Sequence, residues 1–370
     1  MKPDRDFDRK FMAEAIQLGL THLGLTGSNP SVGCLLVNEG VVVGRAVTAM
    51  GGRPHAETQA LAQAGARARG ATAYVSLEPC SHFGKTPPCA KALIDAGVAR
   101  VVVSVMDPDD RVAGRGLAML AEAGIAVESG VMEEEGKRSL IAYLTRQTKR
   151  RPYVTLKLAI SADRKIGRLG EGQIAISGPE ARLEVQRLRA ETDAILVGIG
   201  TALADDPLLT VRLPGEEDRS PLRIVLDPQL SLPPSNKLVA TAGEVPVIAV
   251  ATEPPGFDDQ KDEAFLARRA TLDEAGVEIL QCDPQRLDIL LSALASRGIS
   301  SLLVEGGAKT ASRFLEAGLV DRIILYKGQL VIGERGIDAP VSEGEIPEGF
   351  TLRDQRQVGA DQRYEFERDI

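Results

Sequence analysis

The first ninety residues hold side chains that could bind a catalytic zinc ion. His55 stands two residues before Glu57, and two cysteines follow at Cys80 and Cys89. Zinc in enzymes prefers imidazole and thiolate ligands, and a catalytic site takes three protein ligands and leaves the fourth position to water. His55, Cys80 and Cys89 supply such a set. On a helix, Glu57 points to a different azimuth from His55, so its carboxylate can reach the water as a general acid and base without binding the metal.

This arrangement is that of the zinc nucleobase deaminases, with one departure. Their second cysteine usually follows Pro-Cys after two residues, whereas Cys80 and Cys89 are nine positions apart. On spacing alone, these cysteines could be buried structural residues beside an unrelated histidine. However, the segment Glu78–Cys89, EPCSHFGKTPPC, resembles the metal loop of the riboflavin-biosynthesis deaminases nearly letter for letter. The resemblance implies that Asn29 binds substrate, and it extends to NPSVG at 29–33, HAE at 55–57 and VAGRG at 112–116.

The other histidines and cysteines have less specific settings. His22 and Cys34 lie in apolar elements, and we expect them in the core rather than at a metal. His82 and Lys85 lie within the metal loop, where a substrate or phosphate contact and a loop-shaping role fit the sequence equally well. Cys282 is isolated in the second half of the chain, and we expect it to be either structural or exposed and inert.

A glycine-rich turn in the second half could bind an anion. Val304–Thr310, VEGGAKT, has the pattern of a strand, a tight turn and a helix start. Backbone N–H groups at such a turn suit a dinucleotide pyrophosphate. The order of a Walker loop is missing, and Gly198 with Gly200 does not complete a Rossmann fingerprint. The turn alone is therefore a weak signal.

Two adjacent acids form the other motif of the second half. Asp205 and Asp206 precede Pro207, and Arg212 follows five residues later. An Asx-Pro sequence commonly starts a turn, so a structural role and a functional role both fit these residues.

Together these segments resemble the reductase half of the same riboflavin-pathway family, which is similar to dihydrofolate reductase in fold and uses NADPH. The resemblance covers nearly the whole chain, with the deaminase first and the reductase second. It implies a catalytic role for Asp205 and cofactor contacts from Ala159, Ala175, Thr201, Asp205, Gly307, Ala308, Lys309 and Thr310. It implies substrate contacts from Gln173, Ser177, Arg189, Leu209, Arg212 and Glu305, and the two arginines suit a phosphate.

The reductase half departs from the family pattern at two places. Members often read Ser-Leu-Asp-Gly-Lys where this chain has SADRK at 161–165, and Ser-Gln-Trp-Ile where it has GQIAI at 172–176. The missing tryptophan removes one stacking surface for cofactor or substrate. The roles of Gln173, Ala175 and Ser177 are therefore left open.

These residues must be positioned by alternating strands and helices. In the first half we expect helices at 7–18, 56–68, 90–96 and 116–123, and strands at 32–37, 41–46, 73–77, 100–105 and 125–128. In the second half we expect a helix at 179–190 and strands at 153–160, 194–197, 223–226, 247–251, 301–304 and 322–326. The alternation predicts an α/β architecture. The resemblance implies a cytidine-deaminase-like three-layer α/β/α domain followed by a dihydrofolate-reductase-like α/β domain.

We place the domain boundary where the charge changes sign. Glu133–Glu135 is acidic, Lys149–Arg151 is basic, and Pro152 follows. We interpret this segment as a solvated linker helix rather than a binding patch. The expected domains are residues 1–149, the zinc-dependent pyrimidine deaminase, and 150–370, the NADPH-dependent reductase.

Composition excludes several classes of protein. The chain has 370 residues, of which 44% are hydrophobic and 26% charged, as in soluble proteins of two or three domains. No apolar run approaches the ~18 residues of a membrane span, and the charged N-terminus has no signal-peptide pattern. Four cysteines favour a reduced, cytoplasmic setting. Residues 1–149 carry 17 basic and 16 acidic side chains and residues 150–370 carry 27 and 36, so neither half suits nucleic acid.

The residues and the resemblance together predict a bifunctional riboflavin-pathway enzyme with Zn2+ and NADPH as cofactors. It would deaminate 2,5-diamino-6-(5-phosphoribosylamino)pyrimidin-4-one and then reduce the ribosyl group to ribityl. We expect a small phosphoribosyl pyrimidine as its partner, with no nucleic acid and no membrane, and leave a homo-oligomer open. The alternatives are a nucleic-acid or nucleoside deaminase with a non-catalytic C-terminal domain, and a binding protein with a structural zinc.

Overall fold

The chain forms two compact units, Met1–Arg151 and Pro152–Ile370. The computed structural model describes residues 5–82, 87–109, 112–252 and 259–369, with the backbone alone for 259–262. The boundary expected between residues 149 and 150 lies two residues before the division of the chain, which falls between Arg151 and Pro152. Each unit is built around its own sheet.

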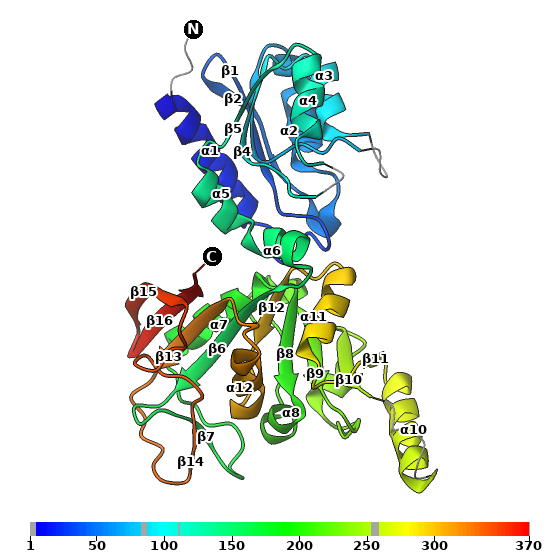
Figure 1. Ribbon diagram of the computed structural model, residues 1–370, viewed down its shortest axis with the longest axis vertical. Coiled ribbons are helices and arrows are strands. Elements are labelled where there is room, and N and C mark those ends of the chain that lie inside the picture. The colour runs from blue at the N-terminus through cyan, green and yellow to red at the C-terminus, as the bar shows by residue number, and fades with distance from the viewer. Residues whose placement is uncertain (1–4, 83–86, 110–111, 253–258, 370) are drawn as a thin grey trace. The chain divides into compact units, whose positions relative to one another are not determined.

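The first unit is a five-stranded sheet with the order β2-β1-β3-β4-β5 (Figure 1). Its strands are β1 (Gly33–Asn38), β2 (Val41–Val47), β3 (Thr72–Leu77), β4 (Arg100–Val105) and β5 (Ala126–Ser129). Its helices are α1 (Arg5–Leu20), α2 (Ala56–Ala64), α3 (Cys89–Asp95), α4 (Arg115–Glu122), α5 (Glu133–Ser139) and α6 (Ile141–Lys149). Strand β1 runs antiparallel to β2 and β3, whereas β3, β4 and β5 are parallel.

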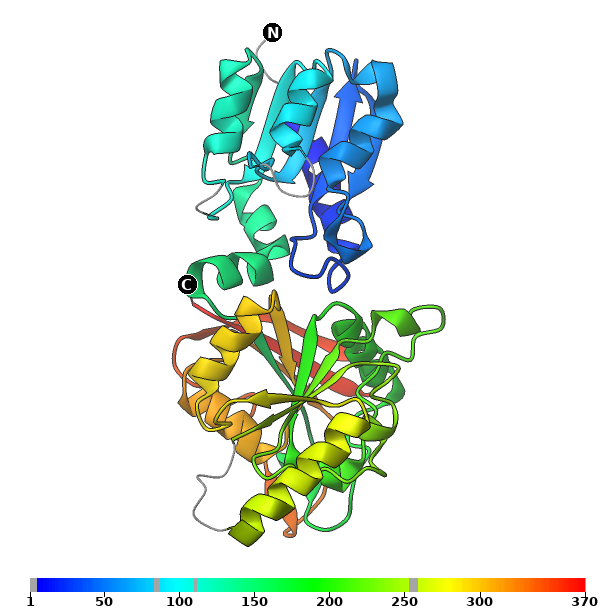
Figure 2. The same ribbon diagram turned by 90° about the vertical axis from the view of Figure 1, so that its right-hand side faces the viewer.

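Helices cover both faces of this sheet, as alternating apolar side chains require. Leu35 and Tyr74 point to one face, where they pack against the apolar side of α1. Leu36 and Val75 point to the other face, where they join a cluster with Ala60 of α2 and buried residues of α3 and α4. Helices α1 and α5 lie on the first face and α2, α3 and α4 on the second (Figures 1 and 2). The expected three-layer α/β/α domain is confirmed.

Two local expectations for the first unit are wrong. The helix expected at 56–68 is α-helical only to Ala64, because Gly65 adopts a positive φ of 56°, and it continues as a 3₁₀ turn over Gly65–Ala68. The expected solvated linker helix is instead two short helices, α5 and α6, which pack on the unit. Tyr143 is buried and donates to Asp107, and Arg146 donates to the Ser28 carbonyl. These two hydrogen bonds hold α6 against the rest of the unit, although the ends of the 133–151 segment are charged.

The second unit is a nine-stranded sheet with the order β11-β10-β9-β8-β12-β6-β13-β16-β15, with a small β14-β7 sheet beside it. Its strands are β6 (Tyr153–Ile160), β7 (Lys165–Arg168), β8 (Ala194–Gly198), β9 (Leu222–Leu226), β10 (Val247–Ala251), β11 (Glu278–Gln281), β12 (Ser301–Val304), β13 (Arg322–Lys327), β14 (Gly336–Asp338), β15 (Phe350–Val358) and β16 (Asp361–Arg368). Its helices are α7 (Pro179–Ala190), α8 (Ile199–Asp205), α9 (Lys237–Ala240), α10 (Asp259–Glu274), α11 (Leu287–Ser296) and α12 (Ala308–Glu316).

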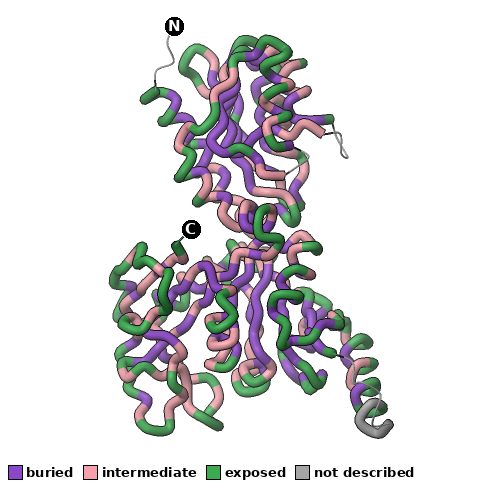
Figure 3. The backbone as a smooth tube through the Cα atoms, viewed as in Figure 1, coloured by how far each residue is buried: buried purple, intermediate pink, exposed green. Residues whose placement is uncertain are grey.

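The central strands of this sheet place loops from distant parts of the chain at one edge. Strands β6, β8, β12 and β13 are parallel neighbours, so their carboxyl ends meet at the same edge. Helices α11 and α12 pack on one face and α8, α9 and α10 on the other. The strands between them are largely buried (Figure 3). In such a sheet, ligands bind beyond the carboxyl ends of the strands.

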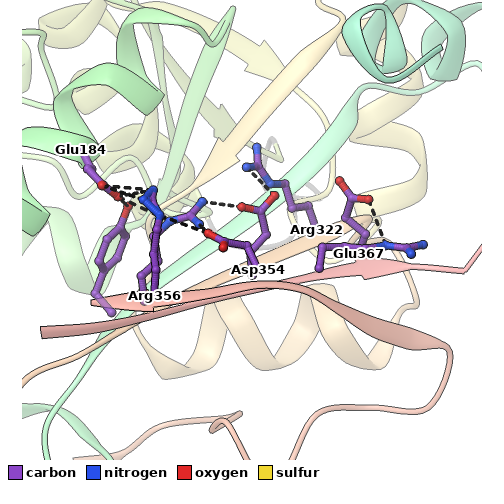
Figure 4. Close-up of polar contacts among 9 residues, drawn as sticks. Glu184, Arg322, Asp354, Arg356 and Glu367 are labelled. Atoms are coloured by element: carbon purple, nitrogen blue, oxygen red, sulfur yellow. Dashed lines mark hydrogen bonds and ion pairs between the residues drawn. The ribbon is translucent and has the colours of Figure 1, made fainter. Parts of the chain in front are cut away.

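The C-terminal hairpin of β15 and β16 was not expected from the sequence. Most residues of β15 are exposed, so the strand lacks the alternating apolar pattern that identifies other strands. Charged contacts hold the hairpin to α7 (Figure 4). Glu184 of α7 pairs with Arg356 at 3.1 Å and with Arg363 at 3.5 Å, and Arg363 also pairs with Asp354 at 2.6 Å. These ion pairs give the hairpin specific contacts, which it needs because β15 offers little apolar surface for packing.

Candidate active sites

The first unit gathers three metal-binding side chains from separate elements. His55 immediately precedes α2, Cys80 follows β3, and Cys89 begins α3. Their ligand atoms all lie within 4.8 Å of one another. The Nδ1 atom of His55 is 3.7 Å from the Cys80 sulfur and 3.4 Å from the Cys89 sulfur. The structure therefore brings together the three residues that the sequence assigns to a metal.

The spacing of these atoms fits a tetrahedral zinc ion. Zinc–nitrogen bonds of about 2.0 Å and zinc–sulfur bonds of about 2.3 Å give a nitrogen–sulfur edge of about 3.5 Å at the tetrahedral angle. The two observed nitrogen–sulfur distances, 3.7 and 3.4 Å, lie on either side of this value. A hydrogen bond from the Cys89 side chain lowers the pKa of Cys80 to about 4, and the same contact raises the pKa of Cys89, so the pair without a metal holds its negative charge on Cys80. Three ligands leave the fourth position open.

Glu57 lies in the first turn of α2 beside this triad. Its side chain is buried, with 3% of the residue exposed. Burial and then the negative charge of Cys80 raise the pKa of Glu57 to about 7, whereas the charge of His55 opposes this shift. A carboxyl group with a pKa near neutrality can both accept and donate a proton. This setting suits a general acid and base, and a dication bound at the triad would favour its ionised form.

The remaining candidates of the first unit take different positions. Asn29 lies against the turn that leads into His55, since a Cβ on Gly52 would lie 2.4 Å from the Asn29 amide nitrogen. Cys34 is fully buried in β1, as expected of a core residue, and His22 is half-buried with Nδ1 2.7 Å from the Thr48 carbonyl oxygen. His82 is half-buried at the start of the metal loop.

The metal loop itself is described only in part. Lys85, which the sequence places beside His82 in this loop, lies outside the described residues. Among those that are described, the buried Nδ1 atom of His82 has no hydrogen-bond partner. Cys282 of the second unit is buried next to α11 and lies apart from any described metal-binding group, as expected.

The carboxyl edge of the second sheet brings the glycine-rich turn next to α8. The hydroxyl of Thr201, in the first turn of α8, accepts a hydrogen bond of 2.9 Å from the Gly307 N–H. Gly307 is the residue before α12, and as a glycine it has no side chain that could cap that helix. The first backbone N–H groups of α12, at Ala308 and Lys309, therefore lack helical acceptors and suit an anion. The Thr310 side chain packs against Gly198, so only its backbone remains for such a role.

A buried charge cluster lies at the same edge. Glu305 accepts hydrogen bonds of 2.8 and 3.0 Å from Nε and Nη2 of Arg189, and Lys157 of β6 lies 3.9 Å from the same carboxylate. Burial would raise the pKa of Glu305, but the charges of Arg189 and Lys157 outweigh it and the pKa falls below its usual value. Burial also lowers the pKa of Lys157. The cluster has one more cation than anion.

The two arginines expected to bind phosphate differ in their contacts within the protein. Arg189 is already engaged by Glu305 and also donates to the Thr210 carbonyl. Arg212 is exposed, and in the described part of the chain its guanidinium has no hydrogen bond or ion pair. Leu209, expected to line the substrate site, instead buries its side chain in the core with 3% exposed, so only its backbone can face a ligand. Of these two arginines, Arg212 is thus the one available to a phosphate.

The two adjacent aspartates have different surroundings. Asp206 accepts from the backbone N–H of Lys237 at 2.8 Å and pairs with the same lysine's ammonium. Asp205, the last residue of α8, is half-buried, and no described residue donates a hydrogen bond to its carboxylate. Burial alone raises the pKa of Asp205. The turn-capping role that the sequence left open for Asp205 therefore has no contact to support it.

The loop of Gln173, Ala175 and Ser177 also reaches this edge. A Cβ on Gly328, which follows β13, would lie 2.2 Å from the Ile176 carbonyl oxygen, and one on Gly172 would lie 3.3 Å from the Ala204 carbonyl oxygen. The loop therefore runs between the end of α8 and the end of β13. Ala159, near the end of β6, pairs in register with Tyr326 of β13.

Lys157 is a candidate that sequence reasoning did not single out. It lies in β6, where buried residues alternate with half-buried ones, and it occupies a half-buried position on the same face as Ala159. A cation at an inner position of a central strand is the signal that could have identified it, because lysine is rarely buried without a partner.

Comparisons with known proteins support both units. The family described as cytidine and deoxycytidylate deaminase zinc-binding region matches residues 5–105, and the family described as RibD C-terminal domain matches residues 152–363. The riboflavin biosynthesis protein RibD of Aquifex aeolicus is 41% identical over 89% of this chain and 89% of its own length. That of Escherichia coli is 39% identical over 96% and 97%. In the described residues, no helix is long and apolar enough to span a membrane.

Solved structures agree with these matches. RibD of Acinetobacter baumannii has a TM-score of 0.87 with this chain at 34% identity, covering 99% of this chain and 100% of that one. A protein of Thermotoga maritima, described as a diaminohydroxyphosphoribosylaminopyrimidine deaminase and 5-amino-6-(5-phosphoribosylamino)uracil reductase, has a TM-score of 0.85 at 31% identity and the same coverage. The expected order of a deaminase domain followed by a reductase domain is confirmed. The chain belongs to the RibD family, the bifunctional deaminases and reductases of riboflavin biosynthesis.

Proposed function

We propose that the first unit hydrolyses the amino group of 2,5-diamino-6-(5-phosphoribosylamino)pyrimidin-4-one, and that the second reduces the ribosyl group of the product to ribityl with NADPH. One observation carries the proposal most: the triad of His55, Cys80 and Cys89, at zinc-binding distances, lies beside the buried acid Glu57. The relatives that match nearly the whole chain are proteins of riboflavin biosynthesis, and their similarity favours a phosphoribosylaminopyrimidine as the substrate.

In the first unit, His55, Cys80 and Cys89 would hold the zinc ion and Asn29 would contact the substrate. A bound zinc ion supplies Lewis acidity and lowers the pKa of a water molecule. Glu57 accepts a proton from that water, passes it to the pyrimidine ring and then delivers a proton to the departing amino group. Water enters and ammonia leaves, so the ring carbon becomes a carbonyl with no change in redox state.

In the second unit, NADPH would lie across the carboxyl edge of the sheet. NADPH supplies the hydride for the ribosyl C1. The free N–H groups at the start of α12 suit its phosphates, with Thr201 fixing the preceding turn through Gly307. We assign the substrate phosphate to Arg212, because Arg189 is already paired with Glu305. Asp205 would stabilise the positive charge that develops at C1 as the sugar ring opens.

The remaining proposed contacts lie along the same edge. Ala159, Ala175, Lys309 and the backbone of Thr310 would face the cofactor. Gln173, Ser177, Glu305 and the backbone of Leu209 would face the substrate. We expect a small-molecule enzyme of the cytoplasm that binds no nucleic acid, because none of its four cysteines forms a disulfide and its second unit is acidic.

A coupled assay tests the whole proposal. The chain loaded with zinc should oxidise NADPH when given the diamino phosphoribosyl substrate, and should release one ammonia per NADPH consumed. Removal of zinc with a chelator should stop oxidation with that substrate and leave oxidation with the deaminated compound unchanged. Ammonia release from a nucleoside without a phosphoribosylamino group, with no NADPH oxidation, would contradict the proposal.

A further inference from the structure

Glu78 is a buried carboxylate held by backbone groups of a distant segment. Only 4% of the residue is exposed. Its Oε2 atom accepts from the N–H groups of Asp107 at 3.3 Å and Gly114 at 3.0 Å, and its Oε1 atom from those of Gly116 at 3.0 Å and Leu117 at 3.3 Å. Four backbone donors converge on one side chain that lies two positions before the metal ligand Cys80.

Two of these bonds satisfy the amino end of helix α4. The helix begins at Arg115, and its preceding residue, Gly114, has no side chain that could cap it. Gly116 and Leu117 are the second and third residues of the helix, whose N–H groups have no helical acceptor. The Glu78 carboxylate, coming from the end of β3, therefore replaces a local cap and meets the positive end of the helix dipole.

The first turn of α4 also packs against the segment that leads to the zinc ligand Cys80. A Cβ on Gly116 would lie 2.1 Å from the Pro79 carbonyl oxygen, so the helix backbone touches the residue between Glu78 and Cys80. On its other side Cys80 is tied to α3: the Cys89 N–H donates to its sulfur at 3.3 Å, and the Ala90 N–H to its carbonyl oxygen at 3.2 Å. The backbone at Cys80 is thus fixed between α4 and α3.

We infer that Glu78 is a positioning residue of the zinc site. By anchoring α4 to the end of β3, it fixes Pro79 and so holds the Cys80 sulfur at the distance from His55 that a tetrahedral ion requires. Groups that orient metal ligands without touching the metal typically contribute 10- to 100-fold in metal affinity. This inference rests on the proposed zinc site, and it adds a role that no residue of the triad performs.

The test is the zinc affinity of the full chain, measured by competition with a chromophoric chelator at a temperature where circular dichroism shows every variant folded. Glu78→Gln keeps the side chain's shape but turns an NH2 group toward N–H donors. We expect zinc affinity to fall by about 10-fold or more. Reduction of the deaminated substrate, a reaction of the other unit, should remain at the wild-type rate.

Asp8→Asn is the matched control. Asp8 is also a buried carboxylate of the first unit, but it bonds Tyr74 and Arg100 on the face of the sheet opposite α2, α3 and α4. Its loss should lower the melting temperature without changing zinc affinity. Unchanged affinity in Glu78→Gln, or an equal loss in both variants, would overturn the inference.

A second variant decides the question if Glu78→Gln does not fold. Gly116→Ala leaves the carboxylate intact but forces α4 away from Pro79, and it should weaken zinc binding by about 10-fold. Gly136→Ala is its control: Gly136 lies in another helix, α5, and a Cβ there would lie 2.2 Å from the hydroxyl of Ser104 in β4. Wild-type affinity in Gly116→Ala would overturn the inference. A wild-type chain that binds no zinc would instead overturn the proposed function.

Discussion

Asp205 is a half-buried acid whose carboxylate receives no hydrogen bond from any described residue. Its neighbour Asp206 makes the local contacts of this turn, with the backbone and ammonium of Lys237. A carboxylate that burial disfavours and no contact compensates is a cost to the fold. We therefore expect Asp205 to serve the reaction of the second unit, and the substitution Asp205→Asn separates the two roles.

The effect of Asp205→Asn on stability should be small. The substitution removes no hydrogen bond, so the free energy of unfolding should change by less than about 0.5 kcal/mol, as at positions without specific contacts. The sign follows from the pKa of Asp205, which burial raises. An acid whose pKa is higher in the folded state destabilises the fold once the pH rises above its unfolded pKa of about 3.9. The variant should thus be slightly more stable than the wild type at pH 7 and equal to it at pH 3.

The effect on reduction should be large. Removing one group that stabilises developing charge typically costs about 10²-fold in rate, which is about 2.7 kcal/mol of activation free energy. The assay is single-turnover oxidation of NADPH with the deaminated substrate, with NADPH affinity measured separately by fluorescence. We expect near-normal NADPH binding and a rate lowered by about 10²-fold.

Asp206→Asn controls for the loss of a negative charge at this turn. Asp206 has a φ of 42°, a left-handed conformation that asparagine tolerates, and its amide oxygen can still accept from Lys237. This variant should reduce substrate at close to the wild-type rate. Equal rates for Asp205→Asn and the wild type would refute the electrostatic role and leave Asp205 without a function in reduction.

The remaining predictions concern the first unit and the division of the chain. Glu57→Gln should keep one zinc per chain and lose about 10²-fold in deamination, because an amide cannot accept the proton; full activity would exclude the general-base role. Cys80→Ala should lose zinc and deamination but not reduction, and retained zinc would remove the site assignment. Burial opposes ionisation of Asp8, but bonds from Arg100 and Tyr74 lower its pKa. Asp8→Asn should therefore cost about 3 kcal/mol at pH 7, and denaturant titrations should show this cost vanishing as the pH falls through the folded pKa. Residues 1–151 and 152–370 should each fold when expressed alone, and insolubility of either fragment alone would contradict this.

The elements that carry apolar alternation were predictable from the sequence. The strands β1 and β2 were expected from two apolar runs, and between them Glu39 and Gly40 have the positive φ values, 50° and 78°, of a tight hairpin turn. Strands such as β6 and helix α7 begin and end where apolar spacing places them. By contrast, β15 is held by ion pairs with residues of α7 and β16. The Glu184–Arg356 pair joins residues 172 positions apart, and no local pattern shows it.

The candidate sites were predictable to different degrees for a related reason. The zinc ligands and Glu57 belong to two short motifs, so their chemistry can be read from adjacent residues. In the second unit, the motifs indicate which loops reach the edge but not which charges neutralise one another. Arg189 and Glu305 are 116 positions apart, and their pairing decides that Arg212 is the one of the two arginines available to a phosphate. Lys157 joins the same carboxylate from a strand with no motif that marks a lysine.

Glu57 and Glu78 show why residue type and burial together do not define a role. Both are glutamates of the first unit with less than 5% of the residue exposed, and both lie within two positions of a zinc ligand. The Glu57 carboxylate faces the charge of Cys80, and its pKa of about 7 lets it exchange a proton near neutral pH. The Glu78 carboxylate accepts four backbone N–H groups, which fix its position against the start of α4. The donors that make this difference come from residues 107–117, so only the fold assigns chemistry to one glutamate and positioning to the other.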